Sequence, residues 1–414
     1  MVSAALSLLA ILFQSICSAN AAPSPTENYG IIMDAGSSGT RIKVYKYFMG
    51  RHSPLAPSDI EQVDVPKPDK IKPGISTFGE NVDNLQDYLK QLIDDAKKSV
   101  PAKFQPETPI MLYATAGMRL LPQNQQEAIF NEVDRLFLDK KFCPFSYRKG
   151  DARIITGEEE GIYGWITLNF LEGRFSPSVK IATLGALDLG GASTQNAYRV
   201  SHVGKGVPTV KVHLAGKDYP LYVHSYLGYG LDQATASYFK YLASNSKRFF
   251  VVSPCHNKHY LKKLQKTNNR QIVVIGAYNR KKCRNLLKRL LFCKGDAKQC
   301  PYVAQPDLEG DFVGMNGYYF VMKDIGAIEN QGQAVSFRKF KKVSNKLCKQ
   351  SSKSLDTSLF QVEDLCFRAN YLYELLKDGY HINFNTFDLR VSLEVNGFDL
   401  SWALGALLYN TKIL

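Results

Sequence analysis

The sequence predicts an α/β protein of two lobes with a ligand-binding cleft between them. Its 414 residues are more than one compact hydrophobic core usually holds, so two lobes are the expected arrangement. A turn of glycine and small residues follows an apolar strand at residues 34–40 and again at residues 188–194, and strands alternate with amphipathic helices between them. Two such copies predict a duplicated lobe, with both turns facing one cleft.

The composition is that of an ordinary globular protein. Apolar residues make up 45% of the chain and charged residues 22%, which excludes a disordered chain, a collagen-like rod and a coiled coil. Beyond the amino terminus, no apolar run reaches the roughly 18 residues that a membrane span needs. A multipass transporter is therefore excluded, and we expect no transmembrane anchor once the leader is removed.

The first residues have the pattern of a signal peptide. An apolar stretch at residues 4–16 is followed by small residues and by Ala-Asn-Ala at residues 19–21. An uncleaved anchor is the alternative, but the apolar stretch is short for a membrane span. We therefore expect a secreted, extracellular protein.

Seven cysteines remain after removal of the leader, which carries Cys17. Their spacing matches no zinc site, and disulfides are the default in an oxidising compartment. Six of them lie in residues 255–366, and the spacing alone does not fix how they pair. Cys143 has an apolar context and is expected to be a small buried residue rather than a reactive thiol. The pairs of nearest neighbours are Cys255–Cys283, Cys293–Cys300 and Cys348–Cys366.

The first glycine turn has the composition of a phosphate-binding loop. It follows an apolar strand that ends in Asp34, and an alternating strand comes after it, so a hairpin is expected. Glycine lets a ligand approach the main chain closely, and consecutive N–H groups in a turn can surround an anion. No Gly-Lys-Ser/Thr follows, so the turn is not a Walker P-loop. The phosphate-binding candidates are Gly36, Ser37, Ser38, Gly39 and Thr40.

The second turn repeats this pattern after a strand that contains Asp188. A single turn of this kind is commonly just part of a hairpin and binds nothing. Two copies, each behind an apolar strand, are much stronger evidence for a shared anion site. The candidates here are Gly190, Gly191, Ala192 and Ser193.

Two strand–helix units lie between the turns. The strand at residues 110–113 leads into a segment that contains Thr115 and Arg119. Taken alone, these residues could equally well be a capped helix start and a solvated charge, with no role at a site. The helix predicted over residues 123–140 places Ile129, Val133 and Phe137 on one face. A strand and a second amphipathic helix follow.

The second helix starts with three consecutive glutamates. Thr156 and Glu159 form a capping box, and carboxylates suit the first turn of a helix because they face its dipole. Capping therefore explains Glu158 and Glu159 without any catalytic role. Glu160 is not needed for capping, and Gly161 leaves room beside it. A carboxylate close to two phosphate-binding turns is where a water-activating base is expected.

The chain is strongly basic, with a net charge of +14. Residues 258–298 contain a single acid, Asp296, among many lysines and arginines, and residues 338–353 contain none. No DNA- or RNA-reading motif accompanies this charge, so no specific nucleic-acid partner is expected. A basic face that steers polyanionic ligands, or binds acidic glycans weakly, is the favoured interpretation.

Five of these segments together resemble, in order, the apyrase conserved regions. Over residues 29–410 the chain is similar to the ecto-nucleoside triphosphate diphosphohydrolases, or apyrases, of the actin/hexokinase/heat-shock ATPase superfamily, and it resembles their soluble, secreted members. Residues 225–230 are similar to a further segment of that family. The five segments are residues 34–40, 114–119, 156–165, 188–195 and 401–406.

The resemblance implies two ribonuclease-H-like (actin-like) lobes with a nucleotide between them. The two turns would hold the phosphates, and Glu160 would be the general base. Ser193 and Gln195 would hold the attacking water. Asp34 and Asp188 would organise a divalent cation, Ca²⁺ or Mg²⁺, largely through its waters.

The resemblance also places other side chains at the site. Thr115 and Trp402 would lie beside the same metal and phosphate groups, with Thr115 among the catalytic residues. Gly39 stands where many cell-surface members carry histidine, next to the terminal phosphates. Aromatic residues would stack on the base, and the candidates are Tyr318, Tyr319, Phe320 and Tyr371.

These features together predict the domains and the function. We expect a signal peptide at residues 1–21, a first lobe at 28–156 completed by 393–414, and a second lobe at 157–392 that contains the basic, disulfide-rich region 255–366. The expected function is that of a secreted, monomeric apyrase, which hydrolyses the terminal phosphates of nucleoside tri- or diphosphates. The alternatives are an exopolyphosphatase-like hydrolase and a non-catalytic extracellular protein that binds nucleotides or glycans.

Overall fold

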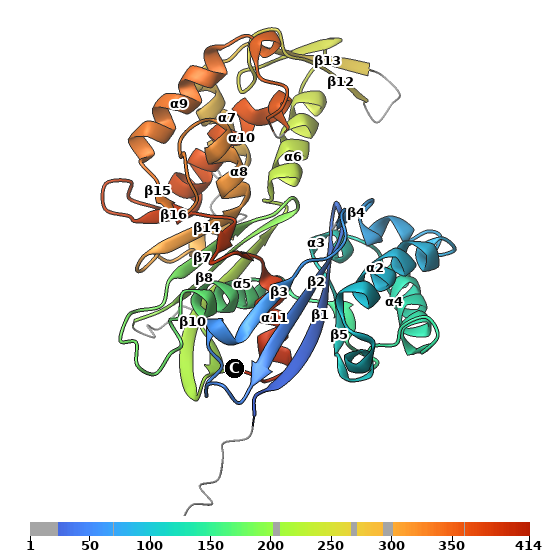
Figure 1. The fold of residues 1–414 in the computed structure, drawn as a ribbon. Helices are drawn as coiled ribbons and strands as arrows, with labels where there is room; N and C mark the ends of the chain where they lie inside the picture. The colour runs from blue at the N-terminus through green and yellow to red at the C-terminus, as the bar shows by residue number, and fades with distance from the viewer. Residues whose placement is uncertain (1–23, 69, 202–207, 266–270, 293–300, 360) are drawn as a thin grey trace, which may run out of the picture.

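The computed structural model describes residues 24–414 except 69, 202–207, 266–270, 293–300 and 360. Two mixed β-sheets lie on either side of a central pair of helices, and further helices cover the outer face of each sheet (Figure 1). The two-lobed α/β architecture predicted from the sequence is therefore confirmed. Along the described residues, no helix combines the length and the apolarity needed to cross a lipid bilayer.

The first sheet and its helices comprise β1 (Thr26–Gly36), β2 (Gly39–Met49), β3 (Ile60–Val63), β4 (Lys70–Ile71), α2 (Leu85–Ser99), β5 (Ile110–Ala114), α3 (Ala116–Arg119), α4 (Gln123–Leu138) and β6 (Ala152–Ile154). The strand order is β3-β2-β1-β5-β6, with β4 paired to β2. β1 and β2 form an antiparallel hairpin, and β5 runs parallel to β1. α2 and α4 cover the outer face, where the predicted apolar stripe of α4 is buried.

The second sheet comprises β7 (Gly185–Leu189), β8 (Ser193–Arg199), β9 (Val210–Leu214), β10 (Lys217–Leu227), β14 (Phe312–Asn316), β15 (Gln333–Ala334) and β16 (Leu389–Val391). Its order is β15-β16-β14-β7-β8-β10-β9. β7 and β8 form an antiparallel hairpin and β14 runs parallel to β7, as β5 does to β1. β10 pairs antiparallel with β8, as β3 does with β2, and β16 pairs parallel with β14, as β6 does with β5. The second sheet therefore duplicates the first, as the two glycine turns predict.

The two sheets share a central layer made of α5 (Gly157–Leu171) and α11 (Trp402–Asn410). α5 packs against β7, β8 and β10, whereas α11 packs against α5 and β1. α5 begins with the predicted capping box, because the Thr156 hydroxyl accepts from the Glu159 N–H and the Glu159 carboxylate accepts from the Thr156 N–H. One hydrophobic core therefore contains residues of both sheets and both helices.

The outer part of the second lobe comprises α6 (Leu231–Ser244), β11 (Phe250–Ser253), β12 (Leu261–Gln265), β13 (Gln271–Gly276), α7 (Arg280–Leu290), α8 (Gly317–Asp324), α9 (Phe337–Lys349) and α10 (Leu365–Glu374). A short hairpin of β17 (Glu394–Val395) and β18 (Phe398–Asp399) leads into α11. The buried helix α10 packs against α6, α7, α8 and α9. β11, β13 and β12 form a separate three-stranded sheet beside them.

Two of the three nearest-neighbour cysteine pairs form disulfides. Cys255–Cys283 joins the end of the small sheet to α7, and Cys348–Cys366 joins α9 to α10. Cys293 and Cys300, like the leader, lie outside the described residues. Cys143 is buried and unpaired, as expected, and burial raises the pKa of its thiol to about 11.

The contact between α5 and α11 leaves no room for a side chain at Gly405. A Cβ atom there would lie 2.0 Å from the Tyr163 carbonyl oxygen. The Gly405 N–H also donates to Thr167 Oγ1 at 2.8 Å, which fixes the two helices in register.

Replacement of this glycine, Gly405→Ala, is expected to lower the free energy of unfolding by about 3 kcal/mol, because the helices must separate. Gly164→Ala is a matched control on α5, since a Cβ atom there would lie 3.5 Å from the flexible side chain of Met315. The control is expected to be neutral or slightly stabilising, because alanine favours a helix by about 1 kcal/mol over glycine. Chemical denaturation followed by circular dichroism measures both values. Equal stability of Gly405→Ala and the wild type would contradict the close contact.

A buried hydrogen-bond chain joins the small sheet to the start of α10. The Tyr238 hydroxyl lies 2.7 Å from Ser253 Oγ, which lies 2.7 Å from His256 Nδ1, and His256 Nε2 lies 3.2 Å from Asp364 Oδ1. Serine, histidine and aspartate in this order are the groups of a hydrolase triad. Ser253 and His256 are fully buried, however, so no substrate reaches them. The chain is a structural link between the two elements.

This link predicts acid destabilisation. Burial lowers the pKa of His256, so below about pH 6.5 the unfolded chain binds a proton that the folded chain does not. The free energy of unfolding therefore falls by about 1.4 kcal/mol for each further pH unit. Burial opposes ionisation of Asp364, but hydrogen bonds from His256 and Tyr260 hold its pKa at about 2, and this stability is lost at still lower pH. Denaturant titrations between about pH 7 and 5 measure the slope. The raised pKa values of Glu160 and Asp34 contribute a slope of opposite sign in this range, so the test is the difference between variant and wild type. His256→Gln is expected to remove the contribution of His256, and a slope unchanged from the wild type would contradict the assignment. The exposed control His213→Gln is expected to keep the wild-type slope.

Candidate active site

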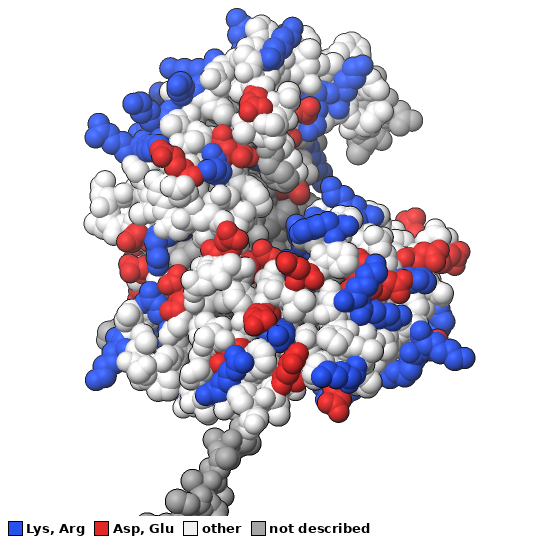
Figure 2. Space-filling model, in the orientation of Figure 1, with Lys and Arg blue, Asp and Glu red and all other residues white. Residues whose placement is uncertain are grey.

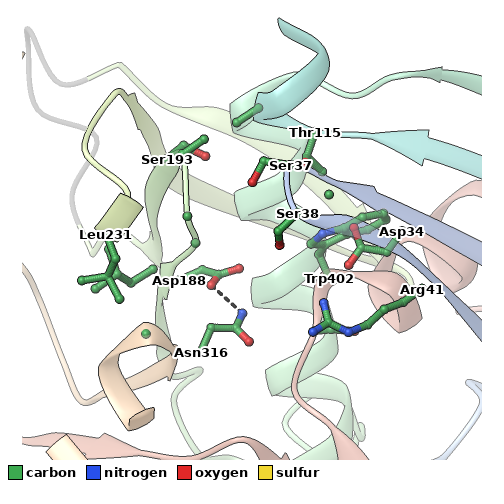
Figure 3. A pocket seen from close by; sticks show the side chains of 18 of the residues that line it. Asp34, Ser37, Ser38, Arg41, Thr115, Asp188, Ser193, Leu231, Asn316 and Trp402 are labelled. Atoms are coloured by element: carbon green, nitrogen blue, oxygen red, sulfur yellow. Dashed lines mark hydrogen bonds between the residues drawn. The ribbon is translucent and has the colours of Figure 1, made fainter. Parts of the chain in front are cut away.

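The turns of the two hairpins meet across one cleft. The cleft has a volume of about 450 Å³ and is lined by Ser37 and Ser38 of the first turn and by residues 190–193 of the second (Figure 3). A Cβ atom at Gly191 would lie 3.3 Å from Ser37 Oγ, so the turns approach to contact distance. Both turns therefore face one cleft, as the duplication predicts.

In the first turn, the end of the hairpin presents two serines. Gly36 pairs with Gly39, which leaves Ser37 and Ser38 exposed between the strands. Gly36 lines the cleft with them. The Ser38 hydroxyl accepts a hydrogen bond from Lys70 Nζ at 2.7 Å, so β4 brings a cation to this turn.

Two residues of the predicted phosphate-binding set do not line the cleft. A Cβ atom at Gly39 would lie 2.5 Å from the Ile71 carbonyl oxygen, because β4 covers this position. Thr40 is fully buried, its N–H donates to the Tyr88 hydroxyl, and its own hydroxyl lies 2.8 Å from the same group. Pairing with β4 and packing on α2 therefore occupy Gly39 and Thr40, and a phosphate-binding role for these two stays a prediction.

The second turn is braced by the start of α6. The Gly190 N–H donates to the Ser193 carbonyl at 3.0 Å, and the Asp232 N–H donates to the Gly191 carbonyl at 2.9 Å. A Cβ atom at Gly230 would lie 2.4 Å from the Gly191 carbonyl carbon. The turn is thus held rigidly, with residues 190–193 lining the cleft.

Glu160 lies in the first turn of α5 and lines the same cleft. Its side chain is held by Arg119 Nη2 at 2.5 Å and by Gln195 Nε2 at 3.1 Å, both of which donate to Oε2. Burial raises the pKa of Glu160 to about 7, although Arg119 opposes this shift. The capping box holds Glu159 outside the cleft, so the structure separates the capping glutamate from Glu160 as the sequence predicts.

Gln195 connects Glu160 to the second turn. Its Nε2 also lies 2.8 Å from Ser193 Oγ and 3.0 Å from Ser225 Oγ. Its Oε1 is buried and has no hydrogen-bond partner among the described residues. A buried acceptor without a partner is unfavourable unless a donor such as water reaches it.

Two aspartates lie on opposite sides of the cleft, Asp34 near the end of β1 and Asp188 in β7 (Figure 3). Burial raises the pKa of Asp34 to about 6; Arg41 opposes the shift and Asp188 adds to it. Burial also raises the pKa of Asp188, which accepts a hydrogen bond from Asn316 Nδ2 at 2.7 Å. Carboxylates desolvated in this way favour a bound cation.

The residues present fit a divalent cation that is held largely through water. No group of three or more His, Cys, Asp or Glu side chains in the described part of the chain is arranged to bind a metal directly. Two carboxylates and the nearby hydroxyl of Thr115 are oxygen ligands, the type that Mg²⁺ and Ca²⁺ prefer. Mg²⁺ in particular usually keeps several of its waters. Trp402 lies in the wall of the same cleft, as expected.

Several cations of the cleft were missed by reasoning from the sequence. Burial and the charges of Arg41 and Lys72 lower the pKa of Lys70, which shows that the three cations are clustered. Lys70 and Lys72 reach the cleft because Ile71 pairs with Thr40 across β2 and β4. A two-residue strand leaves no periodic pattern that could have indicated this pairing.

Asn316 was also missed, although the duplication of the sheets could have pointed to its position. It ends β14, which occupies in the second sheet the place that β5 occupies in the first. Its backbone has φ 54° and ψ −114°, the first central position of a type II′ turn. This strained conformation aims its amide at Asp188.

The predicted base-binding aromatics are only partly at the cleft. Phe320 lines the cleft and is 37% exposed. Tyr318 and Tyr371 are fully buried in the core outside the cleft lining, and the Tyr371 hydroxyl donates to the Tyr229 carbonyl. Tyr319 is partly buried and lies outside the cleft lining.

Duplicated sheets that share a helical layer, with a glycine turn from each sheet on one cleft, are the architecture that the resemblance to the actin-like superfamily implies. The chain belongs to the GDA1/CD39 (nucleoside phosphatase) family, which matches residues 20–414. It is therefore a nucleoside phosphatase, and the resemblance seen in its five segments is confirmed.

Individual relatives agree with this assignment. The chain is 30% identical to ectonucleoside triphosphate diphosphohydrolase 1 of Rattus norvegicus, over 93% of this chain and 81% of that protein. It is 31% identical to ectonucleoside triphosphate diphosphohydrolase 5 of Gallus gallus, over 95% of this chain and 90% of that protein. It is 27% identical to nucleoside-diphosphatase mig-23 of Caenorhabditis elegans, over 99% and 83%.

Solved structures share the fold. Nucleoside triphosphate hydrolases from Neospora caninum superpose with a TM-score of 0.70 at 17% identity, over 99% of this chain and 96% of that one. A Ppx/GppA family member from Aquifex aeolicus superposes with a TM-score of 0.53 at 15% identity, over 94% and 98%. At these identities the comparison establishes the actin-like, two-lobed fold.

Proposed function

We propose that this protein is an extracellular apyrase, which removes terminal phosphates from nucleoside tri- and diphosphates with a water molecule activated by Glu160. The observation that carries the proposal is the position of Glu160 between the two turns, hydrogen-bonded to Gln195. The names of the relatives, which include triphosphate diphosphohydrolases and a diphosphatase, support both substrate classes. The apolar stretch at residues 4–16 supports an extracellular location, where the protein would act as a monomer.

The phosphates would lie between the two turns. Hydrolysis of a phosphoanhydride requires charge on the phosphate oxygens to be neutralised. Backbone N–H groups at residues 36–38 and 191–193 can donate to these oxygens, and the hydroxyls of Ser37 and Ser38 add donors. The clustered cations Lys70, Lys72 and Arg41 repel each other, and a bound polyanion relieves that repulsion.

Glu160 would take a proton from the attacking water. Arg119 and Gln195 both donate to its Oε2, and no hydrogen bond among the described residues ends on its Oε1. Oε1 would therefore accept one proton of the water, and Gln195 Oε1 would accept a hydrogen bond from the other. Ser193 Oγ holds the Gln195 amide in the required orientation. The water oxygen then attacks the terminal phosphorus, and the remaining nucleotide leaves.

The remaining residues that line the cleft suggest where the cation and the base bind. Asp34 and Asp188, with Thr115 beside them, would hold Ca²⁺ or Mg²⁺ mainly through its waters. The cation would supply positive charge to the phosphate oxygens. Phe320 would stack on the base, because it is the exposed aromatic residue of the predicted set that lines the cleft.

A phosphate-release panel tests the activity. The purified protein is expected to release phosphate from ATP and ADP when Ca²⁺ or Mg²⁺ is added, and to lose this activity in EDTA, because the paired aspartates need a cation. Long-chain polyphosphate is included because the basic cleft also suits a longer polyanion. Full activity in EDTA would contradict the cation assignment. Faster release from polyphosphate than from either nucleotide would favour the exopolyphosphatase alternative.

The substitution Glu160→Gln tests the base. It keeps the size of the side chain but removes its ability to accept a proton, so kcat is expected to fall by about 10²- to 10⁴-fold with little change in thermal stability. Glu158→Gln is the matched control, because it makes the same charge change in the same helical turn outside the cleft lining. Hydrolysis of ATP measures both. A folded Glu160→Gln protein with near-normal kcat would overturn the assignment.

A further inference from the structure

The small sheet β11-β13-β12 presents an apolar face to solvent. Leu261 is 68% exposed, Val252 50% and Phe250 42%. The strand register places these three on one face, where Phe250 pairs with Val273, and where Val252 and Leu261 flank Ile275. Phe249, which precedes β11, is 78% exposed.

The opposite face of this sheet already packs on the protein. Ile272 and Val274 of β13 are fully buried, and Val251 and Leu264 pack against the core of the second lobe. A sheet with one face on a core is expected to be polar on its other face. Here the outer face is apolar as well, which in a soluble protein indicates a surface that binds something.

Positive charge surrounds this outer face. Residues 233–295 contain no aspartate or glutamate. Lys263 lies on the face itself beside Leu261, and Arg248 Cζ lies 5.9 Å from the centre of the Phe250 ring. Lys247 and Lys258, each three residues before a strand of this sheet, are exposed, and none of these four cations forms an ion pair with a described residue. Lys and Arg also outnumber Asp and Glu over the upper lobe in Figure 2.

We propose that this face docks on the surface of an anionic lipid bilayer. The face combines exposed phenylalanine and leucine with unpaired cations, and interfacial membrane binding uses both, since apolar groups enter the headgroup region while lysine and arginine attract anionic lipids. The strands lie at an outer corner of the upper lobe in Figure 1, away from the two hairpin turns of the cleft. None of the residues named on this face lines the cleft.

Other occupants fit this face less well. Two copies of the chain meeting face to face would bring like charges together. An acidic glycan or a nucleic acid would engage the cations through its charge, but it would leave the exposed Leu261 and Val252 without a function. A bilayer satisfies the apolar and the charged groups together.

Co-sedimentation with unilamellar vesicles tests the proposal. The full-length protein is expected to bind vesicles of phosphatidylcholine with phosphatidylserine and to bind pure phosphatidylcholine weakly, with binding reduced by added salt. The double substitution Phe250→Ser and Leu261→Ser is expected to lower the partition coefficient about tenfold or more, because two apolar side chains of this face no longer enter the membrane. Leu138→Ser combined with Ile181→Ser is the matched control, since these side chains are 52% and 62% exposed elsewhere.

The charged groups are tested in the same assay. Arg248→Glu combined with Lys263→Glu is expected to abolish the preference for phosphatidylserine, whereas Lys341→Glu combined with Lys342→Glu on α9 leaves most of the binding in place. All variants are expected to hydrolyse nucleotide in solution at the wild-type rate, which establishes that they are folded. Vesicle binding that the face variants do not reduce, or that the α9 variant reduces equally, would overturn the proposal. Binding to heparin without binding to vesicles, or a dimer that the face variants dissociate, would overturn it in favour of another occupant.

Discussion

The contact between α5 and α11 determines where every group of the cleft lies. α5 rests on the second sheet, α11 rests on β1 of the first sheet, and the two helices touch where Gly405 meets the backbone of Tyr163. Because the helices pack with backbone against backbone, the two sheets have little freedom to shift relative to each other. This close packing is what holds the first turn opposite the second and places the start of α5 between them.

The electrostatics of the cleft follow from that geometry. Glu160, Asp34 and Asp188 are brought together where the surrounding protein desolvates them, so their charged forms are disfavoured. Lys70 and Arg41 stand close to them but also close to each other. The carboxylates and the cations of the cleft do not fully neutralise each other. A metal-bound polyphosphate would supply a partner to each group. The binding energy of such a ligand is therefore available to orient it.

Local patterns were sufficient to predict much of this arrangement. The two hairpin turns, the capping box at Thr156 and the apolar stripe of α4 depend on residues close in sequence, and all are present. The lobes and their cleft followed because the same turn occurs twice. Glu160 could be separated from its neighbours because capping explained Glu158 and Glu159 but not the third acid.

The contacts that could not be predicted join distant segments. Arg119 reaches Glu160 from α3 of the first lobe, and Lys70 reaches the first turn through a strand of two residues. Aromatic residues raised a different difficulty. Tyr318 and Phe320 are both aromatic and lie two positions apart, yet one is buried and the other lines the cleft. Composition does not indicate which side of a short helix such residues occupy.

The backbone of Asn316 restricts which amino acids this position can accept. Glycine would adopt the same dihedral angles more easily, but it would leave the Asp188 carboxylate without its donor. Glutamine would offer an amide, but a longer side chain is disfavoured in this region of the Ramachandran plot. Aspartate tolerates the conformation and would repel Asp188. Few amino acids at residue 316 therefore keep both this backbone conformation and the hydrogen bond to Asp188, even though the residue belongs to none of the five segments that resemble the family.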